Sequence, residues 1–153
     1  MKVLVVYDSV SPKKNTEKVA ETIGDALRSK GMDVQSAYVK NVDPSSLKDY
    51  DCLIVGSPTN ARRPTGLIRS FLDSLTPQVS SGKRGAAFDT RLKGWWAGGA
   101  TGGIERKLGQ LGFRIVVPGL ATYVKGEKGG LLLLDGELDK AKKFAEEIVN
   151  ALQ

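Results

Sequence analysis

The fold is decided by the stretch Lys2-Val3-Leu4-Val5-Val6-Tyr7-Asp8-Ser9-Val10-Ser11-Pro12-Lys13-Lys14-Asn15-Thr16-Glu17. It predicts a buried strand, then a hydroxyl-rich and doubly basic loop, then a helix that begins near Asn15. The first backbone N–H groups of a helix lack partners, and the helix dipole adds partial positive charge there. An anion satisfies both, so the stretch predicts a phosphate site. The alternative is that Ser11 or Asn15 only caps the helix.

The loop supplies groups that suit a phosphate. The candidate ligands are the side chains of Ser9, Ser11, Lys14, Asn15 and Thr16, with Lys13 adding further charge. Charged and neutral donors both bind phosphate oxygens strongly. An exposed lysine pair is also common as plain solvated surface, and that interpretation of Lys13 and Lys14 stays open.

The length and composition predict one globular domain over residues 1–153. The chain has 41% hydrophobic and 26% charged residues, which is typical of a protein in aqueous solution. No apolar run reaches the roughly 20 residues that a membrane span needs. No secretory cleavage pattern follows the first strand. We therefore expect an intracellular, cytoplasmic protein.

The scarcity of cysteine and the lack of histidine exclude several kinds of site. Cys52 is the single cysteine and histidine is absent, so neither an internal disulfide nor a Cys/His metal cluster can form. Ser-His-Asp and Cys-His catalysis are excluded for the same reason. Cys52 lies in an apolar segment and is predicted to be a small core residue.

The formal net charge is +6, which favours anionic partners or simply a solvated surface. The basic residues are scattered apart from four pairs, and no RNA-binding or zinc-finger motif accompanies them. We expect no nucleic-acid partner.

Apolar strand patterns alternate with helical patterns along the chain, which is typical of a parallel sheet covered on both faces. Strands are predicted over Lys2 to Tyr7, Val34 to Val39, Asp51 to Gly56, Lys83 to Phe88 and Phe113 to Val117. Helices are predicted over Asn15 to Lys30, from Asp43 through Leu47, and over Pro64 to Leu75, Ile104 to Leu111 and Gly136 to Leu152.

This alternation predicts a doubly wound α/β domain with a five-stranded parallel sheet in the order 2-1-3-4-5. In such sheets the ligand crevice lies beyond the carboxyl ends of the strands, where the strand order reverses. Three loops are expected to line it: Asp8 to Asn15, Ser57 to Arg63 and Asp89 to Gly99.

Taken together, these loops resemble those of the flavodoxin family over essentially the full chain. The first resemblance is Tyr7-Asp8-Ser9 followed by Asn15-Thr16, which is similar to the family's phosphate loop. The second is Gly56-Ser57-Pro58-Thr59 followed by Arg63-Pro64. The third is Phe88-Asp89-Thr90-Arg91 with Trp95 and Gly98-Gly99-Ala100.

The resemblance implies noncovalent FMN as the cofactor and one- or two-electron transfer as the activity. It assigns the flavin-contacting positions to Pro58, Thr59, Asn60, Ala61, Thr90, Arg91 and Trp95. A flat ring system needs stacking walls and polar backbone groups along one edge, and Trp95 or Trp96 is the expected stacking residue. For both tryptophans, simple surface packing is the alternative.

Three departures from the family pattern matter. Lys14 stands where the family places a glycine, and Pro12, Lys13 and Lys14 lengthen the loop. Asn60 and Ala61 occupy the turn where the family often has an aromatic residue or glycine, so a peptide flip at Asn60 is a hypothesis. Typical members are acidic, whereas this chain is basic, so we expect any redox partner to present an acidic surface.

Other readings remain open from the sequence. A module of the same fold could bind another phosphate-bearing ligand or act in an assembly. A phosphotransfer receiver domain would need acidic and lysine residues where this chain has only Asp8, Ser57 and Pro118. A magnesium site at Asp8 and Asp89 lacks a third oxygen ligand. An FMN-dependent reductase acting on quinones is the nearest enzymatic variant. The oligomeric state is not indicated.

Overall fold

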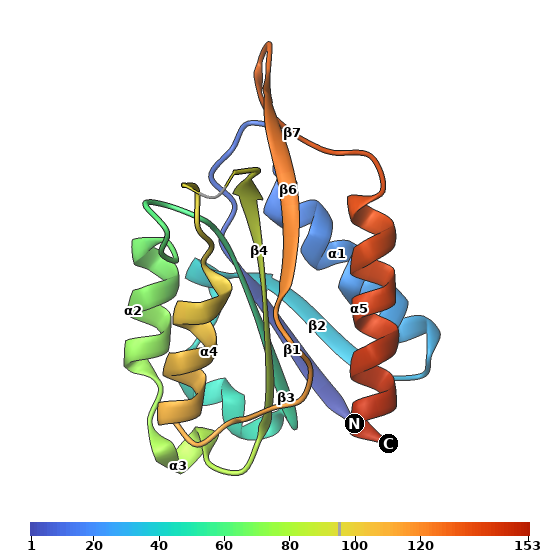
Figure 1. Ribbon diagram of the computed structural model, residues 1–153. Helices are drawn as coiled ribbons and strands as arrows, with labels where there is room; N and C mark the ends of the chain where they lie inside the picture. The colour runs from blue at the N-terminus through green and yellow to red at the C-terminus, as the bar shows by residue number, and fades with distance from the viewer. Residues whose placement is uncertain (95) are drawn as a thin grey trace.

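The computed structural model describes residues 1–94 and 96–153, and its strands form one sheet with helices on both faces (Figure 1). The strands are β1 (Lys2–Tyr7), β2 (Asp33–Tyr38), β3 (Cys52–Pro58), β4 (Arg84–Leu92), β5 (Arg114–Ile115), β6 (Leu120–Glu127) and β7 (Gly130–Leu133). The α-helices are α1 (Asn15–Ser29), α2 (Gly66–Ser74), α3 (Pro77–Ser80), α4 (Thr101–Gln110) and α5 (Glu137–Leu152).

The sheet has the order β2-β1-β3-β4-β6-β7, with β5 paired to the start of β4. β1 pairs in parallel with both β2 and β3. Successive strands are therefore added on one side of β1 and then on the other, and the strand order reverses there. The predicted doubly wound fold and its 2-1-3-4 core are confirmed. The crevice expected at this reversal lies at the end of the sheet from which the β6–β7 hairpin projects (Figure 1).

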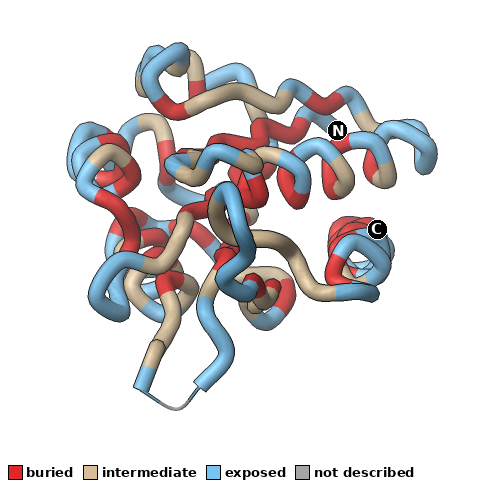
Figure 2. The backbone as a smooth tube through the Cα atoms, turned by 90° about the horizontal axis from the view of Figure 1, so that it is seen from above, coloured by how far each residue is buried: buried red, intermediate tan, exposed pale blue. Residues whose placement is uncertain are grey.

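Two apolar cores lie on opposite faces of the sheet. Val3, Val5 and Tyr7 of β1 pack with α1 and α5, whereas Leu4 and Val6 pack with α2 and α4. Successive strand side chains point to opposite faces, and both faces of this strand are buried. Figure 2 shows buried residues along the strands and the inner sides of the helices, with exposed residues outside.

The fourth strand is longer than the sequence pattern predicts. β4 continues to Leu92, and Asp89 to Leu92 pair with β6. The prediction of a loop beginning at Asp89 was therefore wrong. The extension is mostly polar and therefore lacks the apolar pattern that predicts a strand. Its strand conformation is stabilised by pairing with β6.

The region after residue 112 also differs from the prediction. The expected strand Phe113 to Val117 contains only the short β5, and the main fifth-position strand is β6. Pro118 lacks a backbone N–H and separates the two. β6 then turns back into β7, an antiparallel partner that was not predicted.

Two smaller differences lie at helices. The segment that follows Asp43 is a 3-10 helix, Pro44–Asp49, with Asp43 accepting a hydrogen bond from Ser45 N at 3.0 Å. α4 begins at Thr101, three residues before the predicted start, despite the glycines at 102 and 103. Glycine disfavours helices intrinsically, and the hydrogen bonds that Ala100 N and Thr101 N donate to Asp89 compensate.

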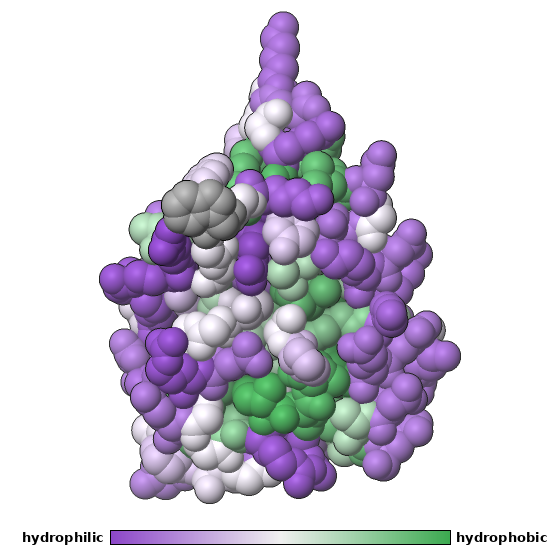
Figure 3. All heavy atoms as spheres, viewed as in Figure 1, coloured by the Kyte–Doolittle hydropathy of each residue, from purple (hydrophilic) through white to green (hydrophobic). Residues whose placement is uncertain are grey.

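Cys52 is fully buried in β3, as predicted, and burial raises the pKa of its thiol to about 12. Hydrophilic residues cover much of the molecule in Figure 3, and apolar atoms reach the surface mainly between α4 and α5. Among the described residues, no helix combines the length and apolar character required to cross a membrane.

Candidate functional site

A small cleft of about 90 Å³ lies beyond the carboxyl ends of β1, β3 and β4. It brings together seven of the predicted site residues: Ser11, Asn15, Thr16, Pro58, Thr59, Thr90 and Arg91. The three segments expected to meet at the topological reversal do meet there.

The first loop contains a turn that accommodates its proline. Lys14 N donates to Ser11 O at 3.0 Å, which closes a four-residue turn with Pro12 at its second position. Proline favours that position, where its fixed φ suits the turn and no N–H is needed. Pro12 therefore removes no donor that the turn uses.

Lys14 adopts the left-handed conformation, with φ 54° and ψ 46°. It stands directly before α1, at the position where the family pattern has glycine. A residue with a Cβ is strained in this conformation, whereas glycine is not. The lysine side chain is exposed and does not line the cleft. Lys14 therefore contributes to the start of α1 through its backbone.

Replacing Lys14 by glycine is expected to raise the free energy of unfolding by about 0.5–1 kcal/mol, because relief of left-handed strain exceeds the extra flexibility of the unfolded chain. Urea unfolding followed by circular dichroism measures this. The matched control is Lys13→Gly, at a neighbour without positive φ, which should be slightly destabilised. A destabilised Lys14→Gly variant would contradict the assignment of strain.

Asn15 and Thr16 are buried at the start of α1, each about 2% exposed. Asn15 Nδ2 donates to Leu131 O in β7 at 2.9 Å. Thr16 Oγ1 and Thr90 Oγ1 form a hydrogen bond of 2.9 Å across the cleft. The start of α1 is thus tied to β7 on one side and to β4 on the other.

Ser9 supports the same helix start from outside the cleft. Its hydroxyl accepts a long hydrogen bond, 3.4 Å, from the backbone N–H of Glu17. Glu17 also accepts a 2.9 Å hydrogen bond from the Tyr7 hydroxyl. Burial and then this hydrogen bond raise the pKa of Tyr7 to about 12, so the tyrosine stays a donor at neutral pH.

The second loop forms a tight hairpin. Asn60 and Arg63 exchange two backbone hydrogen bonds of 2.8 and 3.0 Å, and both residues between them have positive φ: 49° at Ala61 and 68° at Arg62. Asn60 itself has no positive φ, and the peptide flip predicted there stays a hypothesis. Paired positive φ angles suit the right-handed twist of a two-residue hairpin.

A buried ionic network fixes the third segment. Arg91 donates to Asp89 through Nε at 3.0 Å and Nη2 at 2.6 Å. Asp89 Oδ2 also accepts the backbone N–H groups of Ala100 and Thr101, at 2.8 and 3.2 Å. Asp89 therefore caps α4 from a distance, which offsets the glycines at its start.

Arg91 lies close to the backbone at Gly99. A Cβ at Gly99 would lie 2.1 Å from Arg91 Cζ, so any larger residue would require the guanidinium to shift. The hydrogen bond to Asp89 raises the pKa of Arg91, and the guanidinium stays charged. The predicted site residue Arg91 thus lines the cleft while its charge is balanced by Asp89.

A larger cavity of about 380 Å³ adjoins the cleft and shares Thr59 and Leu92 with it. Ala61, Arg62, Trp96 and Ala97 also line it. Arg62 Nε donates to Trp96 O at 3.0 Å, which links the hairpin to the third segment. Trp96 is 55% exposed at the rim. The prediction for Trp95 lies outside the described residues.

Four residues of the cleft were not predicted: Val10, Leu92, Val124 and Leu131. Val124 and Leu131 come from the β6–β7 hairpin, neither strand of which was predicted. The β-branched and aromatic residues Thr122, Tyr123 and Val124 were the available sequence signal for β6.

Asp8 and Asp89 do not form a joint metal site among the described residues. Asp8 accepts hydrogen bonds from Thr65 Oγ1 at 2.6 Å and Ser9 N at 2.8 Å, whereas Asp89 is held by Arg91 and the start of α4. No described group of three or more His, Cys, Asp or Glu residues is arranged to hold a metal ion.

Comparison with known proteins places this geometry in a family. The family model described as flavodoxin matches residues 5–149. The chain belongs to the flavodoxin family. This match covers nearly the whole chain and confirms the resemblance seen in the three loops.

Known flavodoxins are similar over much or all of the chain. A flavodoxin of Aquifex aeolicus is 35% identical over 133 residues, 80% of this chain and 67% of that protein. The solved structure of a flavodoxin from the domain Archaea has a TM-score of 0.81 and 29% identity, with full coverage of both chains. An uncharacterized protein of Methanocaldococcus jannaschii is 27% identical over 95% of this chain, which spans only 36% of that relative's length.

The site fits the cofactor that this family typically binds, FMN. Asn15 Oδ1 and Thr59 Oγ1 are buried without a hydrogen-bond partner among the described residues, and both residues line the cleft. Such groups are costly unless a ligand or water satisfies them. Asn15 Oδ1 suits a hydroxyl of the ribityl chain, while hydroxyl donors and the first amides of α1 suit the phosphate.

The sizes of the two cavities agree with a phosphate and ribityl tail in the cleft and a flavin ring in the adjoining cavity. The 90 Å³ cleft suits a polar tail, and the adjoining 380 Å³ cavity is of the size that accommodates a small planar ligand. The ring would be bounded by the 59–63 hairpin on one side and by Leu92, Trp96 and Ala97 on the other.

Proposed function

We propose that this flavodoxin binds FMN noncovalently and acts in electron transfer. The observation that carries the proposal is the pair of unsatisfied buried atoms, Asn15 Oδ1 and Thr59 Oγ1, in a cleft built from the three predicted segments. A cytoplasmic location remains our expectation for this activity.

The chain's own residues have distinct tasks in this proposal. The start of α1 and the hydroxyls of Ser11 and Thr16 hold the phosphate. Asn15 and Thr59 fix the tail, and the hairpin at Ala61 and Arg62 forms one wall of the ring cavity. When bound, FMN supplies the capacity for one- and two-electron transfer.

The two arginines near the ring cavity differ in their electrostatic effect on a bound flavin. Arg91 is paired with Asp89 and contributes little net field. Arg62 has an exposed side chain at the rim, so its attraction for a reduced, anionic flavin is screened by water and salt. We infer that these two arginines change the reduction potential of a bound flavin only slightly.

The spectrum of the purified protein before and after addition of FMN tests the function. We expect quenching of flavin fluorescence and a dissociation constant below about 1 μM, corresponding to about 8 kcal/mol of binding free energy. Near-ultraviolet circular dichroism verifies that the protein is folded.

Failure of folded protein to bind FMN at micromolar concentration would reject the proposal. The second candidate, a module that binds a different phosphate-bearing ligand, would then be favoured. Its supporting observation is the altered first loop, with Pro12 in the turn and Lys14 in place of the family's glycine.

A further inference from the structure

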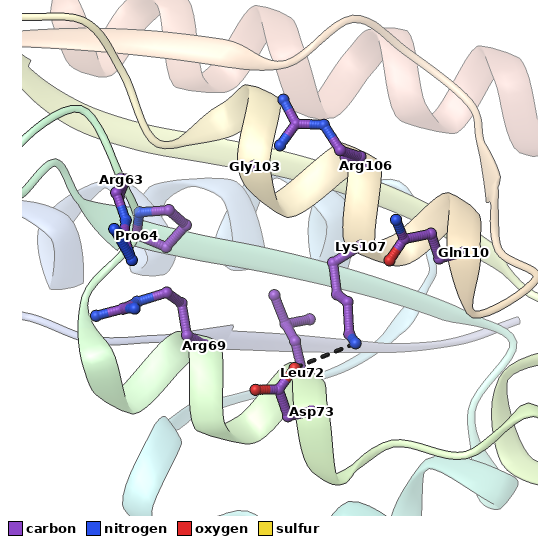
Figure 4. A pocket seen from close by; sticks show the side chains of 9 residues that line it. All are labelled: Arg63, Pro64, Arg69, Leu72, Asp73, Gly103, Arg106, Lys107 and Gln110. Atoms are coloured by element: carbon purple, nitrogen blue, oxygen red, sulfur yellow. Dashed lines mark ion pairs between the residues drawn. The ribbon is translucent and has the colours of Figure 1, made fainter.

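A groove of about 350 Å³ between α2 and α4 gathers basic residues that are distant in the sequence (Figure 4). Its cationic side chains are Arg63, Arg69, Arg106 and Lys107, and Asp73 is the one carboxylate that lines it. The lining therefore carries a net charge of +3. Pro64 and Leu72 form an apolar floor between the two helices.

Three of the four cations are available for a partner. Lys107 Nζ is paired with Asp73 at 3.1 Å, as the dashed line in Figure 4 shows. Within the described part of the chain, no carboxylate lies in ion-pair range of Arg63, Arg69 or Arg106. All three arginines are exposed.

The groove is continuous with the proposed flavin site. Arg63 ends the hairpin whose residues Ala61 and Arg62 line the ring cavity. α4 approaches this hairpin closely, because a Cβ at Gly103 would lie 3.2 Å from Pro64 Cδ. A protein seated in the groove would therefore lie next to one wall of the ring cavity.

We propose that the α2/α4 groove docks an acidic segment of a redox partner protein. The cations come from the hairpin at Arg63 and from α2 and α4, and they do not converge on one point (Figure 4), which suits several separate carboxylates better than one compact phosphate. Arginine is enriched at protein interfaces, where it combines charge with apolar contact. This inference rests on the proposed electron-transfer function for the identity of the partner.

The test uses the whole protein, ¹⁵N-labelled and without added FMN, titrated with a capped hexaglutamate peptide at about 20 mM salt, where screening is weak. We expect amide shift changes concentrated on residues 63–74 and 101–110. The double variant Arg69→Gln, Arg106→Gln should bind the peptide about tenfold more weakly.

The matched control removes the same charge elsewhere. Lys142→Gln, Lys143→Gln changes two exposed residues of α5, and its peptide affinity should stay within about twofold of the unmodified chain, since distant surface charges are largely screened. Equal weakening in both double variants, or shifts spread over other surfaces, would overturn the proposal. Binding of inorganic tripolyphosphate but not of hexaglutamate to the groove would also overturn it, in favour of a small-anion site.

Failure of this inference can be told apart from failure of the proposed function. The Arg69→Gln, Arg106→Gln variant should retain unchanged FMN affinity, because neither arginine lines the cleft or the ring cavity. If the unmodified chain does not bind FMN, the proposed function fails while the peptide titration still decides whether the groove recognises carboxylates.

Discussion

Replacing Asp89 by asparagine is expected to lower the free energy of unfolding by about 3 kcal/mol. The carboxylate is fully buried and paired with Arg91 through two hydrogen bonds. Removing one partner of a buried pair leaves an uncompensated charge, which is far more costly than losing an exposed pair. The amide also weakens the bonds to the first N–H groups of α4.

Urea unfolding followed by circular dichroism measures this effect. The control is Asp25→Asn, which removes the exposed partner of Arg28 and should cost less than about 0.5 kcal/mol. A value for Asp89→Asn within about 1 kcal/mol of the unmodified chain would mean that Arg91 finds water or another acceptor. It would show that the network does not hold the third segment.

Replacing Ser11 by aspartate is expected to weaken FMN binding about 100-fold, because it sets a carboxylate against the phosphate. Ser11 is half-buried and lines the cleft. Its hydroxyl accepts long contacts from Asn15 N and Nδ2, at 3.5 and 3.4 Å, and a carboxylate oxygen can accept them as well. The fold should therefore survive the substitution. Thr16→Glu would repel phosphate too, but it would bury a charge beside Thr90.

Riboflavin, which lacks the phosphate, separates the electrostatic effect from damage to the ring cavity. Ser11→Asp should bind riboflavin as the unmodified chain does, measured by quenching of flavin fluorescence. Ser70→Asp, an exposed position on α2, adds the same charge away from the cleft and should leave FMN affinity unchanged. Equal loss of FMN and riboflavin binding would mean that the phosphate does not lie at the start of α1.

The central part of the fold was predictable because local patterns and packing agree there. The apolar run from Val3 to Tyr7 predicted β1, and the apolar stripe of α1 includes Val19, Ile23 and Leu27, all of which are buried. The start of this helix was predicted near Asn15, and α1 begins at Asn15. In these segments the side chains that specify the element are also those that it buries.

Other features depend on contacts between distant residues and could not be predicted from one segment. Helix α4 begins at Thr101 because Asp89, twelve residues earlier, accepts its amides. The left-handed backbone of the second loop lies at Ala61 and Arg62 and not at Asn60, since the hairpin bonds decide it. Arg63, Arg69 and Arg106 share a groove only because α2 packs beside α4.

The hydrogen bond from Asn15 Nδ2 to Leu131 O joins residues 116 positions apart, and this has a consequence for biosynthesis. A ribosome releases the amino-terminal end first, so the start of α1 cannot form this hydrogen bond until β7 has emerged. Ligand capture by a nascent chain is thereby postponed until most of the polypeptide exists. Truncated translation products that lack the β6–β7 hairpin would have the start of α1 without the contact from Leu131, and we expect them to bind the proposed FMN poorly.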